Sequence, residues 1–300
     1  MSTQGFLVPL SDSNSPSERF FLPPKVGDVV NVGKKHFYLG EQINHGSFAA
    51  VFECFDEWNN PLVAKVLLPN AQTYEQVREK WEREFQALFT VRHPCITFIH
   101  EAFEWRDTFY IIVERCTCSL RDLISVPNFN GNVWFPELAR DLLQALAFIH
   151  PLGQVHKDVH PGNILLHSPY DAQGRFSAAK FKLADFGISR LEDQINPATT
   201  LIYQSAKPPE FFLPQVFGQP CRRADIYQAA LCMLYLLRGE ISRFTPAEIL
   251  AGIPRQMAER LEHPCAPAIA RALRRHVADR TACATEFWED LLFYKSDLNC

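Results

Sequence analysis

The sequence predicts an α+β protein of two unequal lobes, a β-rich N-lobe with one main helix and a mainly α-helical C-lobe. Short extended runs of apolar and β-branched residues, broken by Gly, Asn and Pro, dominate the stretch from Val29 to about Val113. From Leu120 onward, apolar residues recur at helical spacing instead. With 300 residues, 47% of them hydrophobic, the chain can form one large two-lobed domain or two smaller ones.

Each predicted element has a local reason in the sequence. Six extended runs are predicted as strands: Val29–Val30, His36–Leu39, Ala49–Phe55, Leu62–Leu68, Ile96–Phe103 and Phe109–Val113. A helix from Tyr74 to about Thr90 interrupts them. In the C-lobe, Pro136 is expected to open a helix at the favoured first-turn position. The stretch Ala224–Leu237 is apolar nearly all round, which predicts a helix buried on every side.

Composition excludes several function classes. Thirty basic against thirty-four acidic residues leave a net charge of -4, without the positive excess that binds a nucleic-acid backbone. The longest apolar run, Ala229–Leu237, is far shorter than the ~20 residues of a membrane-spanning helix. The sequence also carries no lipid-anchor signal. Nine scattered cysteines indicate free thiols in a reducing compartment, so we expect a cytoplasmic protein.

Two short segments place oxygen-bearing side chains close together. In VHKDVHPGNILL (residues 155–166), Asp158 and Asn163 lie on a polar turn between a helix and a short strand. In LADFGISR (residues 183–190), Asp185 ends another short strand. Carboxylate and amide oxygens are the hard ligands that Mg²⁺ prefers. In this order, the segments resemble the catalytic loop and metal-binding Asp-Phe-Gly segment of the eukaryotic-type protein kinase superfamily.

The resemblance requires a lysine on a strand and a glycine-rich hairpin before it, and both have counterparts. Lys65 follows Val-Ala in LVAKVL (residues 62–67), and INHGSFAAV (residues 43–51) has the form of the hairpin. Only Gly46 matches one of the three glycine positions, because Asn44 and Ala49 occupy the other two. Glycines let backbone amides approach phosphate closely, so these departures weaken the motif. Asn tolerates left-handed turns, so we expect a working but less mobile loop.

A glutamate on the predicted helix should hold Lys65, and helical geometry decides between two candidates. At ~100° per residue, Glu84 falls inside the apolar stripe that contains Val77 and Leu88. Glu82 falls with the solvent-facing charges. A carboxylate on the buried face needs a partner, so we expect Glu84 to pair with Lys65.

The resemblance extends over residues 28–295 and implies a two-lobed protein-kinase-like fold, with an N-lobe of about 28–114 and a C-lobe of about 117–295. Lys207-Pro-Pro-Glu210 stands where the family has Ala-Pro-Glu, and the family pairs this glutamate with an arginine that Arg280 matches. Residues 1–27 are expected to form a flexible leader in which Phe20, Phe21 and Leu22 could dock onto the folded body.

The implied activity is transfer of the γ-phosphate of ATP to a protein hydroxyl, most naturally of Ser or Thr, with Mg²⁺ or Mn²⁺. The resemblance implies the following site residues: Lys65 and Glu84 for the phosphates, Asp158 as the base, His160 beside it, Asn163 and Asp185 for the metal, and Ile43, Gly46, Val51, Ala64, Val113, Glu114 and Cys116 around the nucleotide. Its partners would be protein substrates, without a nucleic acid or a membrane, and the oligomeric state stays open.

Several departures keep alternatives open. Lys157 replaces the family's Arg, and His160 replaces a Lys two places after the catalytic Asp. Our hypothesis is that a protonated His160 substitutes for that Lys, so that activity falls as the pH rises. Two other hypotheses stay open. The chain could be a nucleotide-binding pseudokinase scaffold, or a small-molecule phosphotransferase, since the loops of those enzymes often contain His-Pro-Gly-Asn. A leader on a lone kinase domain would also suit a bacterial effector acting in a host cell.

Overall fold

The chain divides into two compact units, which we describe separately. The computed structural model describes residues 21–45, 49–168, 179–187, 189–195 and 206–296. The N-terminal unit comprises the described residues up to Arg92 together with Phe98–Arg115, and the C-terminal unit comprises His93–Thr97 and the described residues from Cys116 onward.

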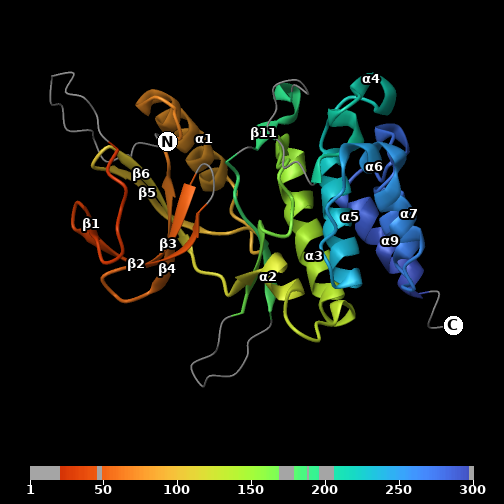
Figure 1. The fold of residues 1–300 in the computed structure, drawn as a ribbon, viewed down its shortest axis with the longest axis horizontal. Helices are drawn as coiled ribbons and strands as arrows, with labels where there is room; N and C mark the ends of the chain where they lie inside the picture. Colours follow the sequence, from red (N-terminus) through yellow and green to blue (C-terminus); the bar gives the residue numbers. More distant parts are fainter. Residues whose placement is uncertain (1–20, 46–48, 169–178, 188, 196–205, 297–300) are drawn as a thin grey trace. The chain divides into compact units, whose positions relative to one another are not determined.

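The N-terminal unit is built on a six-stranded antiparallel sheet with the strand order β1-β2-β3-β4-β6-β5 (Figure 1). Its strands are β1 (Val29–Val32), β2 (Lys35–His45), β3 (Ala49–Phe55), β4 (Pro61–Leu67), β5 (Ile99–Trp105) and β6 (Thr108–Glu114). Apolar residues alternate along them, so one face of the sheet gathers a core that includes Phe52, Cys54, Ala64 and Ile112.

The fifth strand starts three residues later than the sequence predicted. Ile96 forms an isolated parallel bridge with Leu183, and the amide of Thr97 donates to the carbonyl of Leu183 at 3.0 Å. These backbone groups pair inside the C-terminal unit, so β5 begins at Ile99.

The helix of the N-terminal unit, α1 (Tyr74–Thr90), has the predicted bounds. Thr73 begins it with a capping box, in which the Thr73 hydroxyl accepts from the Gln76 amide and the Gln76 side chain accepts from the Thr73 amide. Trp81 Nε1 donates to the Tyr110 carbonyl at 3.0 Å, which fixes the helix against β6.

The C-terminal unit is mainly helical, with two small sheets. Its helices are α2 (Leu120–Ile124), α3 (Gly131–Ile149), α4 (Pro214–Phe217), α5 (Arg223–Arg238), α6 (Pro246–Ala251), α7 (Ile253–Glu259), α8 (Ala266–Ala272) and α9 (Ala284–Ser296). Its strands are β7 (Cys118–Ser119), β8 (Gln154–Val155), β9 (Ile164–His167), β10 (Lys180–Leu183) and β11 (Arg190–Leu191), in the orders β10-β9-β7 and β11-β8. Short 3₁₀ turns are η1 (His150–Leu152), η2 (Glu192–Gln194), η4 (Pro209–Phe211) and η5 (Val277–Asp279).

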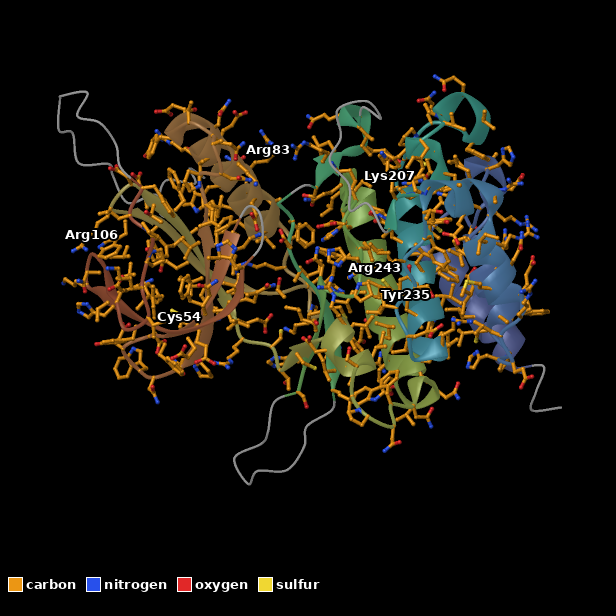
Figure 2. All side chains as sticks on the ribbon, in the orientation of Figure 1. Cys54, Arg83, Arg106, Lys207, Tyr235 and Arg243 are labelled. Atoms are coloured by element: carbon orange, nitrogen blue, oxygen red, sulfur yellow. The ribbon has the colours of Figure 1, made fainter. Side chains whose placement is uncertain are left out.

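Helix α5 is the core of the C-terminal unit and packs beside α3 (Figure 1). Every residue from Ala224 to Leu236 is buried, as the all-round apolar pattern predicted. Figure 2 shows Tyr235 of α5 among the side chains of this unit, and Cys54 among those of the N-terminal sheet. Among the described residues, no helix combines the length and apolarity needed to cross a membrane.

Pro136 does not open its helix, contrary to the prediction. Helix α3 starts at Gly131, because Asn130 caps it by accepting from the Asn132 amide at 3.1 Å. A Cβ at Gly131 would lie 2.0 Å from the Leu236 carbonyl oxygen, so glycine allows the first turn of α3 to touch α5. The N-terminal signal is therefore Asn-Gly rather than proline.

Candidate active site

Lys65 and Glu84 meet inside the N-terminal unit. Lys65 lies in β4, and its Nζ donates to Glu84 Oε1 of α1 at 2.5 Å. The Glu84 side chain is 2% exposed and that of Lys65 is 17% exposed. Glu82, the other helix candidate, pairs instead with Arg78 at 2.9 Å, and its side chain is 43% exposed. The helical stripe therefore selected the glutamate that faces the strand.

One face of the sheet surrounds Lys65. Val51 lies opposite Lys65 in the register of β3 and β4, and Val63 lies opposite Val113 in β4 and β6. All four side chains are partly buried rather than enclosed in the core. This face presents small apolar side chains around one ammonium group, which suits the flat ring and the phosphates of a nucleotide.

Ala64 does not belong to this face, which corrects the sequence-based assignment. It is 0% exposed and packs with Phe52 and Ile112 in the core on the opposite side of the sheet. Side chains alternate across a strand, so the neighbours of Lys65 on its own face are two residues away. Val63, two residues before Lys65, is a neighbour in β4 that shares the face of Lys65.

The hairpin between β2 and β3 is described only at its two arms. Ile43 is 51% exposed, and Asn44 pairs with Val51 across a register shift. Asn44 Oδ1 accepts from the His45 amide at 2.8 Å, a local turn that the side chain of asparagine supports. Gly46, the proposed phosphate-covering residue, lies outside the described residues.

Glu114 and Cys116 belong to the segment that leaves β6. The Glu114 amide donates to the Phe98 carbonyl at 3.0 Å, and the Phe98 amide donates to Glu114 Oε1 at 2.6 Å. The amide of Thr117 donates to Leu166, which continues the chain into β7. Cys116 is half-buried and is not part of a disulfide. Backbone bonds thus hold Glu114 within the N-terminal unit and Thr117 within the C-terminal unit.

In the C-terminal unit, Asp158 and Asn163 are brought together by the loop before β9. Asn163 Nδ2 donates to the carbonyl oxygen of Asp158 at 3.0 Å and to Asp158 Oδ2 at 2.9 Å. The Asp158 amide in turn donates to His156 Nδ1 at 3.2 Å. These bonds fix the orientation of the carboxylate and of the carboxamide together.

The buried carboxylate of Asp225, in α5, accepts hydrogen bonds from the loop and holds it in place. Asp225 Oδ2 accepts from the His156 amide at 2.8 Å and lies 2.9 Å from His150 Nε2, while Oδ1 accepts from the Lys157 amide at 2.7 Å. Burial acts to raise the pKa of Asp225, but hydrogen bonding to His150 and the loop amides outweighs it and lowers that pKa. Lys157 has a φ of 66°, an unusual left-handed conformation that these two amide bonds stabilise.

Asp185 lies beyond β10 in a left-handed conformation with a φ of 63°. Its Oδ1 accepts from the Gly187 amide at 3.1 Å. His156 joins it to the loop: His156 Nε2 lies 3.1 Å from the Ala184 carbonyl, and its ring meets Phe186 edge-on at 4.7 Å. One buried histidine therefore contacts both segments that carry the proposed site carboxylates.

The surroundings of His160 oppose the protonated state that our sequence-based hypothesis requires. Burial lowers its pKa to about 4, with further lowering from Arg121 and His156 that Asp185 only partly offsets. Nδ1 accepts from the Gly162 amide at 3.0 Å, so the neutral ring carries its proton on Nε2. Nε2 lies 3.7 Å from Asp158 Oδ1. His160 therefore lies beside Asp158 in surroundings that favour its neutral form, because burial removes the water that would solvate its charge.

A fully buried ion pair joins η4, which contains Glu210, to Arg280, which directly follows η5. Arg280 donates to Glu210 from NH1 at 2.7 Å and from NH2 at 2.8 Å, and both side chains are 0% exposed. The Arg280 guanidinium also lies 4.9 Å from the centre of the Tyr227 ring. The expected pair is thus present, joining residues seventy positions apart.

Comparison with known proteins decides the family. The family model described as "Protein kinase domain" matches residues 37–272. The chain belongs to the protein kinase domain family. Its two units carry the α+β architecture of the two-lobed kinase fold.

Individual relatives support the same placement. The chain is 32% identical over 204 residues to the serine/threonine-protein kinase SULU of Caenorhabditis elegans, covering 65% of this chain and 19% of that protein. It is 28% identical over 218 residues to the CBL-interacting serine/threonine-protein kinase 8 of Arabidopsis thaliana, covering 70% and 45%. The chain therefore spans less than half the length of these relatives. The crystal structure of a double mutant of the Mycobacterium tuberculosis PknI kinase domain matches with a TM-score of 0.61 and 20% identity, covering 91% of this chain and 99% of that one.

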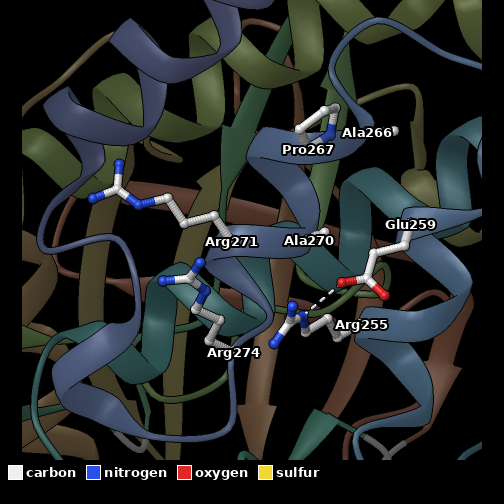
Figure 3. Close-up of a pocket in the computed structure, with 7 residues that line it drawn as sticks. All are labelled: Arg255, Glu259, Ala266, Pro267, Ala270, Arg271 and Arg274. Atoms are coloured by element: carbon white, nitrogen blue, oxygen red, sulfur yellow. Dashed lines mark hydrogen bonds and ion pairs between the residues drawn. The ribbon is translucent and has the colours of Figure 1, made fainter.

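A cavity of about 320 Å³ in the C-terminal unit of this kinase domain lies apart from the kinase motifs. It is lined by residues of α7 and α8 and by Arg274 (Figure 3). Arg255 pairs with Glu259 at 2.8 Å, and Arg271 pairs with Asp290 and Glu286. Carboxylates thus pair with Arg255 and Arg271, whereas Arg274 donates to the backbone carbonyl of Asp279.

Sequence reasoning missed Val63 and Gln228 in this kinase domain. Gln228 Oε1 accepts from the Val159 amide at 3.2 Å, and its Nε2 donates to the Lys157 carbonyl at 3.1 Å. A glutamine in the buried stretch Ala224–Leu236 was the available signal, since a buried amide must find partners. For Val63, the signal was strand alternation.

Proposed function

We propose that this kinase domain transfers the γ-phosphate of ATP to a serine or threonine hydroxyl of a protein, with Mg²⁺ as the metal. The observation that carries this proposal is that Asn163 Nδ2 donates to both the backbone carbonyl and the carboxylate of Asp158. These bonds hold a carboxylate that can accept a proton next to a carboxamide oxygen that can bind a metal ion. The free thiols of the described cysteines favour a reducing compartment, so we infer a cytoplasmic site of action.

The donor set fits Mg²⁺. Because Asn163 Nδ2 is committed to Asp158, its Oδ1 is the carboxamide atom left for a cation, and the Asp185 carboxylate supplies a second hard oxygen. The described residues contain no group of three or more His, Cys, Asp or Glu that could hold a metal ion, so phosphate and water oxygens would complete the set. A bound Mg²⁺ would neutralise charge on the β- and γ-phosphates.

The protein's own residues then act by position and charge. Lys65, held by Glu84, would bind the α- and β-phosphates, and the backbone of Glu114 and Cys116 would bind adenine. The substrate hydroxyl oxygen forms a bond to the γ-phosphorus as the bond to the ADP oxygen breaks. Asp158 accepts the hydroxyl proton, and the Nε2–H of His160 donates a hydrogen bond to the phosphate.

A protein acceptor is supported by the Glu210–Arg280 pair, which fixes the Lys207-Pro-Pro-Glu210 segment that the family uses as its substrate platform. The preference for serine or threonine is supported by the names of the relatives, which are serine/threonine-protein kinases.

The test uses the full chain with γ-labelled ATP, Mg²⁺ and a mixture of dephosphorylated proteins, beside the Asp158→Ala variant. We expect label on protein serine or threonine, and at least ~10²-fold less with the variant, the usual contribution of a positioned base. Equal labelling by both proteins would refute the mechanism. Label on a small hydroxylated compound but on no protein would indicate a small-molecule phosphotransferase.

A nucleotide-binding scaffold is a second candidate, favoured by Asn44 and Ala49 at glycine positions and by the neutral state of His160. Titration calorimetry with Mg²⁺ and ATP separates the two. Binding of ATP without measurable transfer, under any divalent metal, would support the scaffold over the enzyme.

A further inference from the structure

A cavity of about 100 Å³ in the N-terminal unit is lined in part by a residue that precedes the domain predicted from the sequence. Its lining residues are Phe21, Leu67, Pro69, Gln72, Tyr74, Val77, Asp107 and Phe109. Phe21 comes from the leader, whereas the others come from the end of β4, the following loop, the start of α1 and the β5–β6 turn with β6. Phe21 of the leader and the first turns of α1 therefore line the same cavity.

Polar contacts with the sheet flank Pro23 and Pro24. The Leu22 carbonyl lies 3.2 Å from Thr108 Oγ1, whose hydroxyl also lies 3.1 Å from the Arg106 carbonyl. Further along, the Gly27 amide donates to the Leu39 carbonyl at 2.8 Å. The two prolines between these anchors have fixed φ values, so the link is stiff. The position of Phe21 is thus defined by the sheet.

The cavity is coupled to Glu84 through α1. Tyr74 and Val77 on the first turns line the cavity, and Phe109 on its floor lies 5.2 Å from the Tyr74 ring and 5.3 Å from the Trp81 ring. Glu84 follows Trp81 by one turn on the same buried stripe. The two ends of this stripe belong to one helix, so a shift of its first turns would also displace Glu84 relative to Lys65.

We propose that Phe21 is a positioning residue, which braces the start of α1 from the leader and thereby keeps Glu84 at Lys65. The proposal rests on the proposed kinase function for its effect on catalysis. The brace itself is a property of α1 and is measured without activity. It makes the leader part of the working kinase domain rather than a passive extension.

The experiment compares Phe21→Ala with Leu22→Ala in the full chain. Leu22 is the matched control, because its side chain is 52% exposed and does not line the cavity. We expect faster hydrogen–deuterium exchange across residues 74–90 in Phe21→Ala alone, with exchange in α5 unchanged. We also expect the KM for ATP to rise and kcat/KM to fall about tenfold, corresponding to about 1.4 kcal/mol.

Rescue separates bracing from general damage. Phe21→Leu should restore most of the protection of α1, and toluene should restore part of it in Phe21→Ala, because small apolar molecules fill apolar cavities. Unchanged exchange in α1 on loss of the Phe21 ring, or equal effects of both alanine variants, would overturn the brace. An inactive wild type whose α1 still responds to Phe21 would refute the proposed function and leave the brace standing.

Discussion

At the scale of single residues, two glutamates on one helix make a matched pair. Glu84 is buried against Lys65, whereas Glu82 forms an exposed pair with Arg78. Hydrogen bonds to charged groups contribute about 1.5–3 kcal/mol, so we expect Glu84→Gln to lower kcat/KM by ~10–100-fold. Exposed pairs contribute little, so Glu82→Gln should leave it unchanged. Steady-state kinetics of both variants measures this, and similar losses in the two would contradict the assignment.

His160 predicts an acid-sensitive fold. Its pKa is lowered from 6.5 to about 4, so the unfolded chain binds the proton more readily than the folded one. The resulting stability is complete above pH 6.5 and is lost as the pH falls towards 4, by up to about 3 kcal/mol. Urea unfolding at pH 7 and pH 5 should show a smaller decrease for His160→Gln than for wild type. An identical pH dependence would show that His160 titrates normally in the fold.

At the scale of elements, the alternation of β4 separates two adjacent residues. Val63 shares a face with Lys65, and Ala64 is in the core. We expect Val63→Phe to obstruct the nucleotide face and raise the KM for ATP, with little change in the free energy of unfolding. Ala64→Val should overpack the core, lowering the free energy of unfolding by about 1–3 kcal/mol with a nearly unchanged KM. The reverse pattern would place the nucleotide on the other face.

The close contact between α3 and α5 depends on glycine at position 131, which has no side chain. A Cβ at Gly131 would meet the Leu236 carbonyl at 2.0 Å, and backbone cannot rotate away as a side chain can. Gly131→Ala is therefore expected to destabilise the protein by about 3 kcal/mol despite its better helix propensity. Thermal unfolding measures this. A stabilised variant would mean that the two helices separate at no cost.

Periodicity accounts for what could be predicted about the elements. The stripe of α1 gave its bounds and selected Glu84, and the apolar α5 was recognisable as a buried helix. Ala64 was predicted to line the nucleotide because it is next to Lys65 in the motif. Side chains alternate along a strand, however, so Ala64 faces the core instead. The start of α3 at Gly131 depends on the distant Leu236, and a local signal such as Pro136 does not contain that contact.

At the scale of the whole molecule, the kinase motifs fall into two units that fold around separate cores. Lys65 and Glu84 pair within the N-terminal unit. Asp158 and Asn163 lie in a loop that Asp225 of α5 holds through hydrogen bonds to its backbone amides. The order of motifs in the sequence was sufficient to predict the family. The lowered pKa of His160 could not be predicted from the sequence, because it results from burial that only the folded C-terminal unit creates.

The central claim is that Asp158 accepts the proton while other residues bind the nucleotide. The most direct measurement is the single-turnover rate of γ-phosphate transfer by wild type and Asp158→Asn, with the affinity for Mg²⁺ and ATP determined on the same samples. The account predicts a rate lower by ~10²–10⁴-fold at an unchanged nucleotide affinity. Equal rates, or a loss fully explained by weaker nucleotide binding, would contradict it.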